Sequence, residues 1–181
     1  VIYASTSGTV AVTEDQHDVR AEDAPPPIDL IARWPYYRSK LFAERAAFDR
    51  NAPGFEVVSV NPTLLLGPGD ERGSSTSDVV QFLEKKVPFT PAGGLSFVDA
   101  RDAAQGLVLA LDKGRAGERY LLSAINLTIE AFFGRLARLS GVPVALLEPN
   151  SVLGLSNRLL VPLVERAYIA FPETANALRQ E

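Results

Sequence analysis

The sequence predicts an α/β fold built on a parallel sheet. Two short segments rich in β-branched residues, 1–4 and 55–60, flank a segment at 35–50 whose apolar residues recur at helical spacing. A strand, a helix and a strand in this order are typical of a crossover that joins two parallel strands. Strand and helix patterns continue to alternate further along the 181 residues, so the prediction extends to most of the chain.

Local signals set the ends of the first predicted helix. Pro35 fits its first turn, where a helix needs no N–H donor, and Asn-Ala-Pro-Gly at 51–54 stops it. The polar, Pro-rich segment before it is predicted as a loop. The other predicted segments are a loop at 61–77, a helix around 79–83, strands at 95–98 and 118–122, and a helix at 151–171 interrupted by Pro162.

Capping residues indicate two later helices. Asp99 is expected to cap a helix that ends at Gly114, and Thr128 to cap another that ends at Gly141. Asp99 and Asp102 could also be taken for an acid/base or metal pair, but a cap and a first-turn carboxylate explain them more simply. His17, the single histidine, has no metal partner at ligand spacing, so we predict no metal site.

Composition narrows the classes of function. The net charge is −4 with acidic and basic residues interspersed, so no basic stripe predicts nucleic-acid binding. The absence of cysteine excludes disulfides and thiolate catalysis in this chain. No segment approaches the roughly 20 apolar residues that span a bilayer. We therefore expect a cytoplasmic protein with a small-molecule substrate and with neither nucleic acid nor membrane as a partner.

The segment at 36–44, Tyr-Tyr-Arg-Ser-Lys-Leu-Phe-Ala-Glu, carries the strongest chemical signal. Tyr36 and Lys40 are four residues apart, so a helix places them on one face, one turn apart. A phenol is a weak base at neutral pH, and a nearby ammonium group favours the phenolate. The pair therefore suits general acid/base catalysis. Tyr37 is the rival phenol, and a plain pair on a helix surface is the non-functional alternative.

A cluster of hydroxyl groups, Ser5, Thr6 and Ser7, lies where the first predicted strand ends. The carboxyl ends of parallel strands are where open α/β sheets place their ligands. By itself the cluster is better explained by an ordinary Ser/Thr loop. Together with Tyr36 and Lys40, it predicts a hydroxyl, a phenol and an amine that share one cleft.

Five motifs occur in an order that resembles the extended short-chain dehydrogenases/reductases, also called the NAD-dependent epimerase/dehydratase family. The most similar branches are the dihydroflavonol reductase-like and sugar epimerase-like groups, over roughly residues 1–145. The motifs are the strand and hydroxyl motif at 1–10, Tyr-x-x-x-Lys at 36–40, the Asn-Pro-Thr loop at 61–70, Phe-Val-Asp-x-x-Asp-x-Ala at 97–104, and Gly-Glu-Arg-Tyr-Leu-Leu at 117–122 with Asn-Leu-Thr at 126–128.

This resemblance implies a partial Rossmann-like parallel sheet with helices, plus a smaller C-terminal α/β substrate subdomain. Residues 1–62 are expected to form the C-terminal part of the Rossmann-like domain. Residues 63–181 are expected to form a mixed substrate-binding subdomain with interleaved returns to the Rossmann sheet. The family's Gly-x-x-Gly-x-x-Gly loop, whose amides bind pyrophosphate, has no counterpart in this sequence. We therefore expect the chain to be part of a longer protein and inactive by itself.

The resemblance also implies an activity: a nicotinamide-dependent oxidoreductase or epimerase acting on a carbonyl or secondary alcohol, with NAD or NADP. Thr6 would orient the reacting oxygen, Tyr36 would exchange the proton, and Lys40 would support Tyr36 and hold the ribose hydroxyls. The implied cofactor contacts are Tyr36, Lys40, Pro62, Thr63, Leu64 and Leu65, and the implied substrate contacts are Ser5, Ser7, Ser74 and Ser75. A non-catalytic dinucleotide-sensing or protein-interaction module is the alternative. A homodimer is expected by the same analogy.

Overall fold

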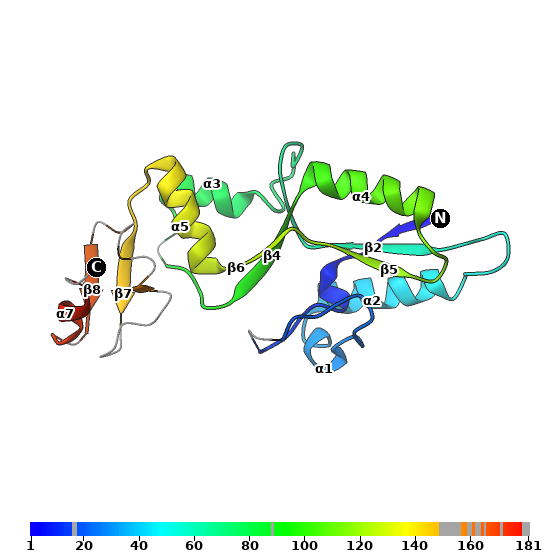
Figure 1. Cartoon of the computed structure of the whole chain (residues 1–181), viewed down its shortest axis with the longest axis horizontal. Helices are drawn as coiled ribbons and strands as arrows, with labels where there is room; N and C mark the ends of the chain where they lie inside the picture. Colours follow the sequence, from blue (N-terminus) through cyan, green and yellow to red (C-terminus); the bar gives the residue numbers. More distant parts are fainter. Residues whose placement is uncertain are drawn as a thin grey trace. The chain divides into compact units, whose positions relative to one another are not determined.

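The computed structural model describes residues 1–15, 18–87, 89–148, 157–158, 161, 164, 166–170 and 172–178. His17 and Pro162 lie outside the described residues. The elements are β1 (Ile2–Ala4), the 3₁₀ helix η1 (Ser7–Thr9), α1 (Ile28–Ile31), α2 (Pro35–Phe48), β2 (Val58–Pro62), β3 (Leu64–Leu66), α3 (Ser77–Leu83), β4 (Gly94–Asp99), α4 (Ala100–Lys113), β5 (Arg119–Leu122), β6 (Ile125–Thr128), α5 (Ile129–Ser140), β7 (Ala145–Glu148), β8 (Arg166–Ile169) and α7 (Thr174–Leu178) (Figure 1).

The chain divides into two compact units. The first comprises Val1–Ser75 and Gly94–Asn126, and the second comprises Thr76–Gly93 and Leu127–Glu181. In the second unit, the rings of Phe82 from α3 and Phe133 from α5 lie 5.2 Å apart, and β7 pairs in parallel with β8. No described helix is both long and apolar enough to cross a membrane.

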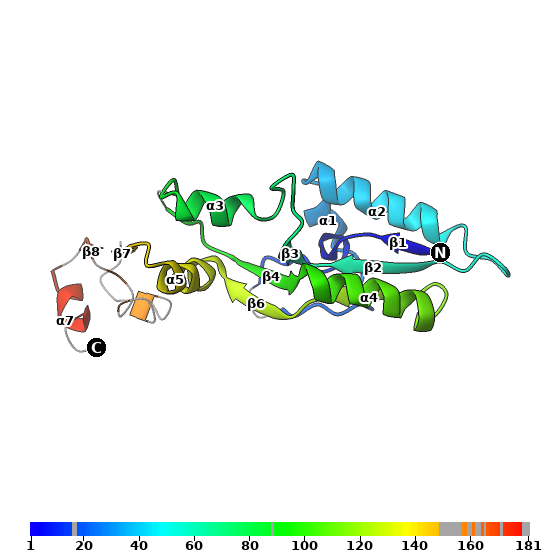
Figure 2. The same ribbon diagram turned by 90° about the horizontal axis from the view of Figure 1, so that it is seen from above.

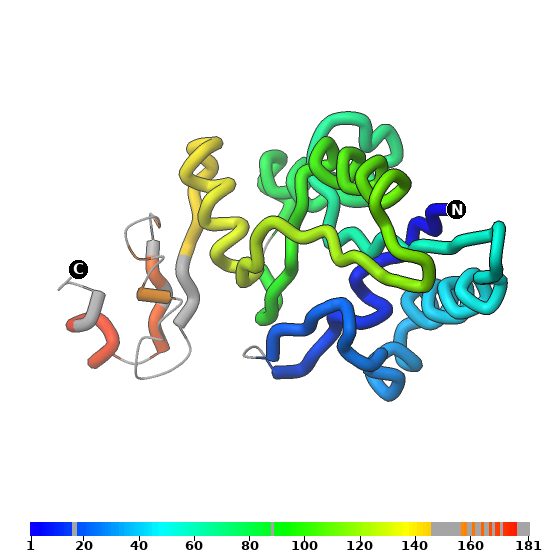
Figure 3. The backbone as a smooth tube through the Cα atoms, turned by 45° about the vertical axis from the view of Figure 1, so that its right-hand side comes forward, coloured from blue at the N-terminus to red at the C-terminus, as the bar shows by residue number. Residues whose placement is uncertain are grey.

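A parallel sheet with the order β1-β2-β5 forms the centre of the first unit. Ile2 aligns with Val58, and Ser59 aligns with Arg119 on the next strand. Figures 1 and 2 show α2 on one face of this sheet and α4 on the other. Figure 3 follows the chain from η1 through the connecting segment to α1 and α2, and then back to β2. The predicted parallel crossover and the α/β fold class are confirmed.

Strand alternation gives the two faces of this sheet different chemistry. Val58 and Val60 point toward α4 and pack on Ala110, with four partly buried residues around them: Ile2, Leu107, Tyr120 and Leu122. The intervening Ser59 and Asn61 are fully buried on the opposite face, toward α2. A polar residue at every second position usually faces water. Here these polar residues face a helix, so each needs a partner inside the protein.

The predicted helix caps are present. Asp99 accepts a hydrogen bond from the backbone N–H of Arg101 at 2.8 Å, and Thr128 accepts one from that of Ala131 at 3.1 Å. Hydrogen bonds from Arg101 hold the pKa of Asp99 at about 2. Gly141 ends α5 with a φ of 69°, a left-handed conformation that glycine adopts without strain.

Two predictions about the region between residues 55 and 77 were wrong. β2 begins at Val58, because residues 52–55 form a tight turn and the N–H of Val57 donates to the side chain of Asn51. The predicted loop 61–77 contains the end of β2 and all of β3, which pairs with β4. A Gly- and Pro-rich composition indicated a loop, but hydrogen bonds to a strand about 30 residues away decide the conformation.

The prediction of a helix over 151–171 was also wrong for residues 166–169, which the structure describes as a strand. Residues 166–169 form strand β8, and its partner β7 at 145–148 was not predicted. Asn157 and Arg158 are helical, and most of the remaining predicted helix lies outside the described residues. The parallel partner of β8 is distant in sequence, so local periodicity carries no signal for it.

Candidate active site

The chain turns sharply where β1 ends. The N–H of Ser5 continues the ladder by donating to the carbonyl of Val60 at 2.8 Å. Thr6 then caps η1, and its Oγ1 accepts from the N–H of Gly8 at 3.4 Å. A hydroxyl that accepts in one bond still has its own proton to donate. Thr6 is half-buried, whereas Ser5 is buried, so Thr6 is the more accessible of the two hydroxyls.

Helix α2 brings Lys40 to the end of β1. The Lys40 ammonium donates to the carbonyl of Ala4 at 2.9 Å and lies 5.6 Å from the centre of the Tyr3 ring. Burial, the carboxylate of Glu44 and the phenol of Tyr36 all raise the pKa of Tyr3. Lys40 and Tyr36 are therefore both neighbours of Tyr3, next to the turn that carries the predicted hydroxyl.

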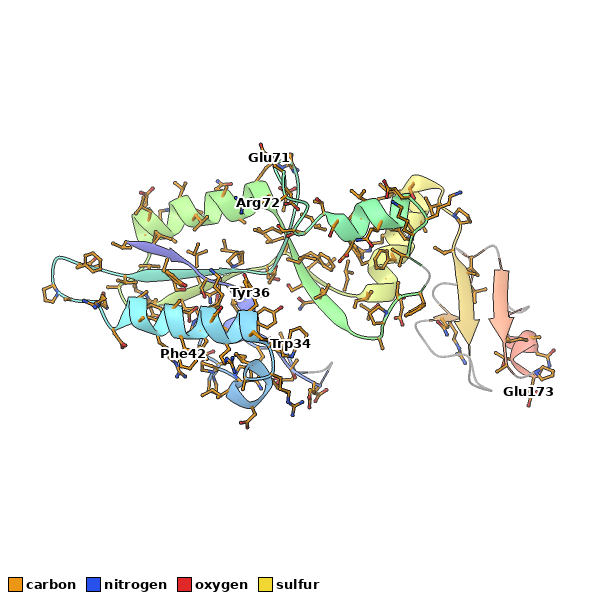
Figure 4. The ribbon with its side chains drawn as sticks, turned by 180° about the vertical axis from the view of Figure 1, so that it is seen from behind. Trp34, Tyr36, Phe42, Glu71, Arg72 and Glu173 are labelled. Atoms are coloured by element: carbon orange, nitrogen blue, oxygen red, sulfur yellow. The ribbon has the colours of Figure 1, made fainter. Side chains whose placement is uncertain are left out.

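The two adjacent tyrosines of α2 have different surroundings. Tyr36 is 59% exposed, and Figure 4 shows it beside Trp34 at the start of the helix. Tyr37 is half-buried, stacks on Trp34 with ring centroids 5.4 Å apart, and packs against Gly8 so closely that a Cβ there would overlap the ring. Burial and the neighbouring Tyr36 raise the pKa of Tyr37. Tyr37 therefore fits a packing role, and Tyr36 is the phenol open to a ligand.

One turn after Lys40, the same helix buries a carboxylate. Glu44 is only 1% exposed, and its Oε1 accepts two hydrogen bonds from Arg119, at 2.6 and 2.9 Å. Its Oε2 accepts from Asn61 Nδ2 at 2.7 Å, and Thr9 Oγ1 lies 3.2 Å from the same oxygen. Ser59 Oγ lies 3.4 Å from the same oxygen and 2.8 Å from Asn61 Oδ1. This cluster, the Glu44 network, supplies the partners that the polar face of the sheet requires.

Hydrogen bonding decides the charge state of Glu44. Burial pushes its pKa upward, but hydrogen bonds from Ser5 and Asn61 and the charge of Arg119 outweigh burial and hold the pKa below its ordinary value. The Ser5 hydroxyl is buried, and this carboxylate is the group that it helps to keep ionised. Ser5 therefore faces the interior of the protein and not an open cleft.

This depressed pKa predicts a dependence of stability on pH. Because Glu44 is more acidic in the folded state, its contribution is complete above its unfolded pKa, about 4.3, and is lost as the pH falls through its folded pKa. In Glu44→Gln, the loss of unfolding free energy relative to wild type should be largest at neutral pH and should shrink below about pH 4. Urea unfolding of the complete protein between pH 7 and pH 3 measures this difference. A difference that stays constant with pH would contradict it.

The predicted substrate loop surrounds a small pocket. A cavity of about 230 Å³ is lined by Leu65, Gly67, Pro68, Gly69, Asp70, Ser74, Ser75 and Ala100. The carboxylate of Asp70 accepts from the N–H groups of Ser74 and Ser75, at 3.0 and 2.8 Å, and from the Ser74 hydroxyl at 3.2 Å. Asp70 thus shapes the loop that presents both serines. Ser7, the remaining predicted substrate contact, is half-buried at the start of η1.

The predicted cofactor segment joins two sheets. Pro62 ends β2, and Thr63 donates both its N–H and its hydroxyl to the carbonyl of Leu122, at 3.0 and 3.1 Å. Leu64 and Leu65 lie in β3, an edge strand of the sheet β3-β4-β6. An edge strand leaves alternate backbone groups without a ladder partner. The donors of Thr63 are therefore engaged, and the open edge of β3 is what remains for a ligand.

Sequence reasoning missed the Glu44 network. Two signals were present: Glu44 continues the four-residue spacing of Tyr36 and Lys40, and Ser59 and Asn61 alternate with valines in a short strand. Neither signal shows that the polar sides of two elements meet, because that depends on tertiary packing. Among the described residues, no group of three or more His, Cys, Asp or Glu side chains could hold a metal ion.

Comparison with known families gives this arrangement a context. A profile of the NAD dependent epimerase/dehydratase family matches residues 1–123, which is more than half of the chain. The chain belongs to this family. The resemblance inferred from the five motifs is therefore confirmed, together with the Rossmann-like fold class that it implied.

One curated relative matches most of the chain, and a second matches about half of it. A Synechocystis sp. protein, provisionally named dihydroflavonol 4-reductase, is 28% identical over 172 residues, which cover 90% of this chain and 50% of the relative. A UDP-N-acetylglucosamine–N-acetylmuramyl-(pentapeptide) pyrophosphoryl-undecaprenol N-acetylglucosamine transferase of Sorangium cellulosum is 54% identical over 91 residues. That match covers 48% of this chain and 22% of the transferase, so it leaves the family assignment unchanged. The chain spans about half the length of its epimerase/dehydratase-type relative.

Solved structures show the same fold. A nucleoside-diphosphate-sugar epimerase from Pseudomonas aeruginosa superposes with a TM-score of 0.71 at 22% identity, covering 99% of this chain and 52% of the epimerase. Gre2 from Candida albicans, in complex with NADPH, superposes with a TM-score of 0.62 at 21% identity, covering 99% of this chain and 58% of Gre2. At these identities the likeness establishes the fold.

Proposed function

We propose that this chain is the catalytic and substrate-side part of a nicotinamide-dependent oxidoreductase or epimerase that acts on a carbonyl or secondary alcohol. The bond between the Lys40 ammonium and the Ala4 carbonyl carries the proposal. It fixes the helix that bears Tyr36 and Lys40 at the carboxyl end of β1, one residue before the turn that bears Ser5 and Thr6. A parallel α/β sheet binds ligands at this end of its strands.

Within this site, each proposed residue has a chemical task. The Thr6 hydroxyl, which accepts from Gly8 N–H, keeps its proton to donate to the reacting oxygen of the substrate. Tyr36 is 59% exposed and would exchange the proton with that oxygen as hydride moves to or from the adjacent carbon. Lys40 donates one N–H to Ala4, so two remain to bind ribose hydroxyls, while its positive charge would stabilise the phenolate.

The residues present fit a nicotinamide cofactor, either NAD or NADP. The cofactor would supply or accept the hydride. The two remaining N–H groups of Lys40 match vicinal ribose hydroxyls, and the edge of β3 at Leu64 and Leu65 offers backbone groups for the carboxamide. Pro62 would contact the nicotinamide, while Thr63 holds the segment in place by its hydrogen bond to the Leu122 carbonyl. Ser7, Ser74 and Ser75 are proposed to contact the substrate, with Ser5 supporting the turn from inside.

The proposal is tested by turnover in the complete protein that contains this chain. NADH and NADPH are supplied with a panel consisting of a dihydroflavonol, a nucleoside-diphosphate ketosugar and a simple aryl ketone. Cofactor oxidation with at least one carbonyl is the expected result. Epimerisation of a nucleoside-diphosphate sugar with bound NAD would support the proposal equally. Tight cofactor binding with no hydride exchange on any substrate would instead favour the non-catalytic, dinucleotide-sensing alternative.

A further inference from the structure

The Glu44 network reaches the backbone of the turn that carries Thr6. Asn61 Nδ2, held by Glu44 at 2.7 Å, also lies 3.0 Å from the carbonyl oxygen of Thr6. Thr9 Oγ1 lies 3.0 Å from this carbonyl oxygen and 3.2 Å from the same carboxylate oxygen. The Thr6 carbonyl thus faces two side-chain donors. Asn61 also donates to Glu44, and the single proton of the Thr9 hydroxyl lies within reach of both this carbonyl and Glu44 Oε2.

The charge of Glu44 fixes the orientation of the Asn61 amide in this network. A carboxylate only accepts, so it requires the amide nitrogen of Asn61, not the oxygen, to face inward. Asn61 Oδ1 is then left to accept from Ser59 Oγ at 2.8 Å. With its nitrogen inward, Asn61 can bond the Thr6 carbonyl. A glutamine at position 44 would place its NH₂ group against the donors of either Arg119 or Asn61, so one part of the network would have to rearrange.

We propose that Glu44 is a positioning residue for catalysis: through Asn61 and Thr9 it fixes the Thr6 turn and so holds the Thr6 hydroxyl against the substrate oxygen. This inference rests on the proposed function. Glu44 touches neither the Thr6 hydroxyl nor Tyr36 in the described contacts, and it acts through the backbone of Thr6. Helix α2 thereby holds the end of β1 at two points one helical turn apart, through Lys40 at Ala4 and through Glu44 at the Thr6 turn.

Two variants of the complete protein test the inference from opposite ends of the network. Glu44→Gln removes the charge at nearly constant volume, and Thr9→Val removes one of the two donors to the Thr6 carbonyl. Each should lower kcat by about tenfold to 100-fold, because a small displacement of a reacting group is enough for that loss. Affinity for NADPH should stay within about twofold, since no network residue is assigned to the cofactor. Thr9→Ser, which restores the hydroxyl, should recover most of kcat.

Amide hydrogen exchange supplies a readout that is independent of turnover. Both variants should raise exchange at residues 5–10 by at least about tenfold while leaving β5 protected, because only the turn loses its anchors. Glu84→Gln, which breaks the exposed ion pair with Lys86 at 2.7 Å, is the matched control and should change neither kcat nor exchange.

Unchanged exchange at residues 5–10 in both variants would overturn the inference, whatever the activity. So would a loss of kcat that merely follows the folded fraction of the protein. If Glu44→Gln fails to fold, Thr9→Val decides the question. If the wild type neither binds NADPH nor turns over any panel compound, the proposed function fails. In that case, increased exchange in the variants would show that the network holds the turn, but its catalytic role would fail with the function.

Discussion

Tyr36→Phe should reduce turnover of the complete protein by about 100-fold to 10,000-fold, the range typical of a lost general acid/base. The substitution removes only the phenolic hydroxyl of a side chain that is 59% exposed, so the fold should be unaffected. Lys40 keeps its bond to the Ala4 carbonyl, so cofactor affinity should change little. Steady-state kinetics and cofactor titration together measure both effects.

Tyr37→Phe is the matched control for this experiment. The ring of Tyr37 packs on Gly8 and Trp34, and a phenylalanine preserves that packing. Turnover close to wild type is expected, because burial holds the pKa of Tyr37 above its ordinary value, the wrong direction for a proton relay near neutral pH. The reverse outcome, an active Tyr36→Phe and an inactive Tyr37→Phe, would assign the proton transfer to Tyr37.

Arg119→Met should destabilise the complete protein by about 3–5 kcal/mol, the cost typical of leaving one partner of a buried ion pair without the other. Arg119 supplies both hydrogen bonds to Glu44 Oε1, and its guanidinium lies 5.9 Å from the Phe48 ring. Methionine keeps the apolar contact with Phe48 but removes both hydrogen bonds and the charge. Urea unfolding at neutral pH, followed by circular dichroism, measures the loss.

The exposed ion pair between Glu84 and Lys86 is the comparison for the buried pair of Arg119 and Glu44. Their contact, at 2.7 Å, is nearly as short as the buried one at 2.6 Å, but both side chains are exposed. Lys86→Met should therefore cost no more than about 1 kcal/mol. Adding Glu44→Gln to Arg119→Met should recover part of the loss, because no buried charge then remains unpaired. If Arg119→Met lowers the free energy of unfolding no more than Lys86→Met does, water must be hydrating the Glu44 carboxylate in place of Arg119.

Elements with local signals were predicted well. Pro35 at the start of α2, the Asp99 and Thr128 caps and the glycine after α5 are each set by short-range hydrogen bonds or backbone preferences. The strands β3 and β8 were missed because their ladder partners are distant in sequence. A three- or four-residue strand has little periodicity of its own, and its conformation depends on the neighbour that satisfies its backbone.

The candidate site divides in the same way. Tyr36 and Lys40 could be paired from their four-residue spacing, since one helix is enough to place them on one face. The same spacing favoured Tyr36 over Tyr37, whereas the packing of Tyr37 against Gly8, about 30 residues away, could not be predicted because it depends on tertiary contacts. The difference between Ser5 and Thr6 likewise became visible only when the buried carboxylate behind Ser5 was located.

The sequence by itself determined the fold class, the family and the order of the chemical groups, because strand and helix periodicities, caps and motifs are written in short stretches of chain. Only the tertiary structure decided that Lys40 binds the end of β1 and that Glu44 is buried as an ion. A carboxylate is stable inside a protein only where donors from several segments converge on it. Here those donors come from Thr9, Asn61 and Arg119, which are distant in sequence and adjacent in the fold.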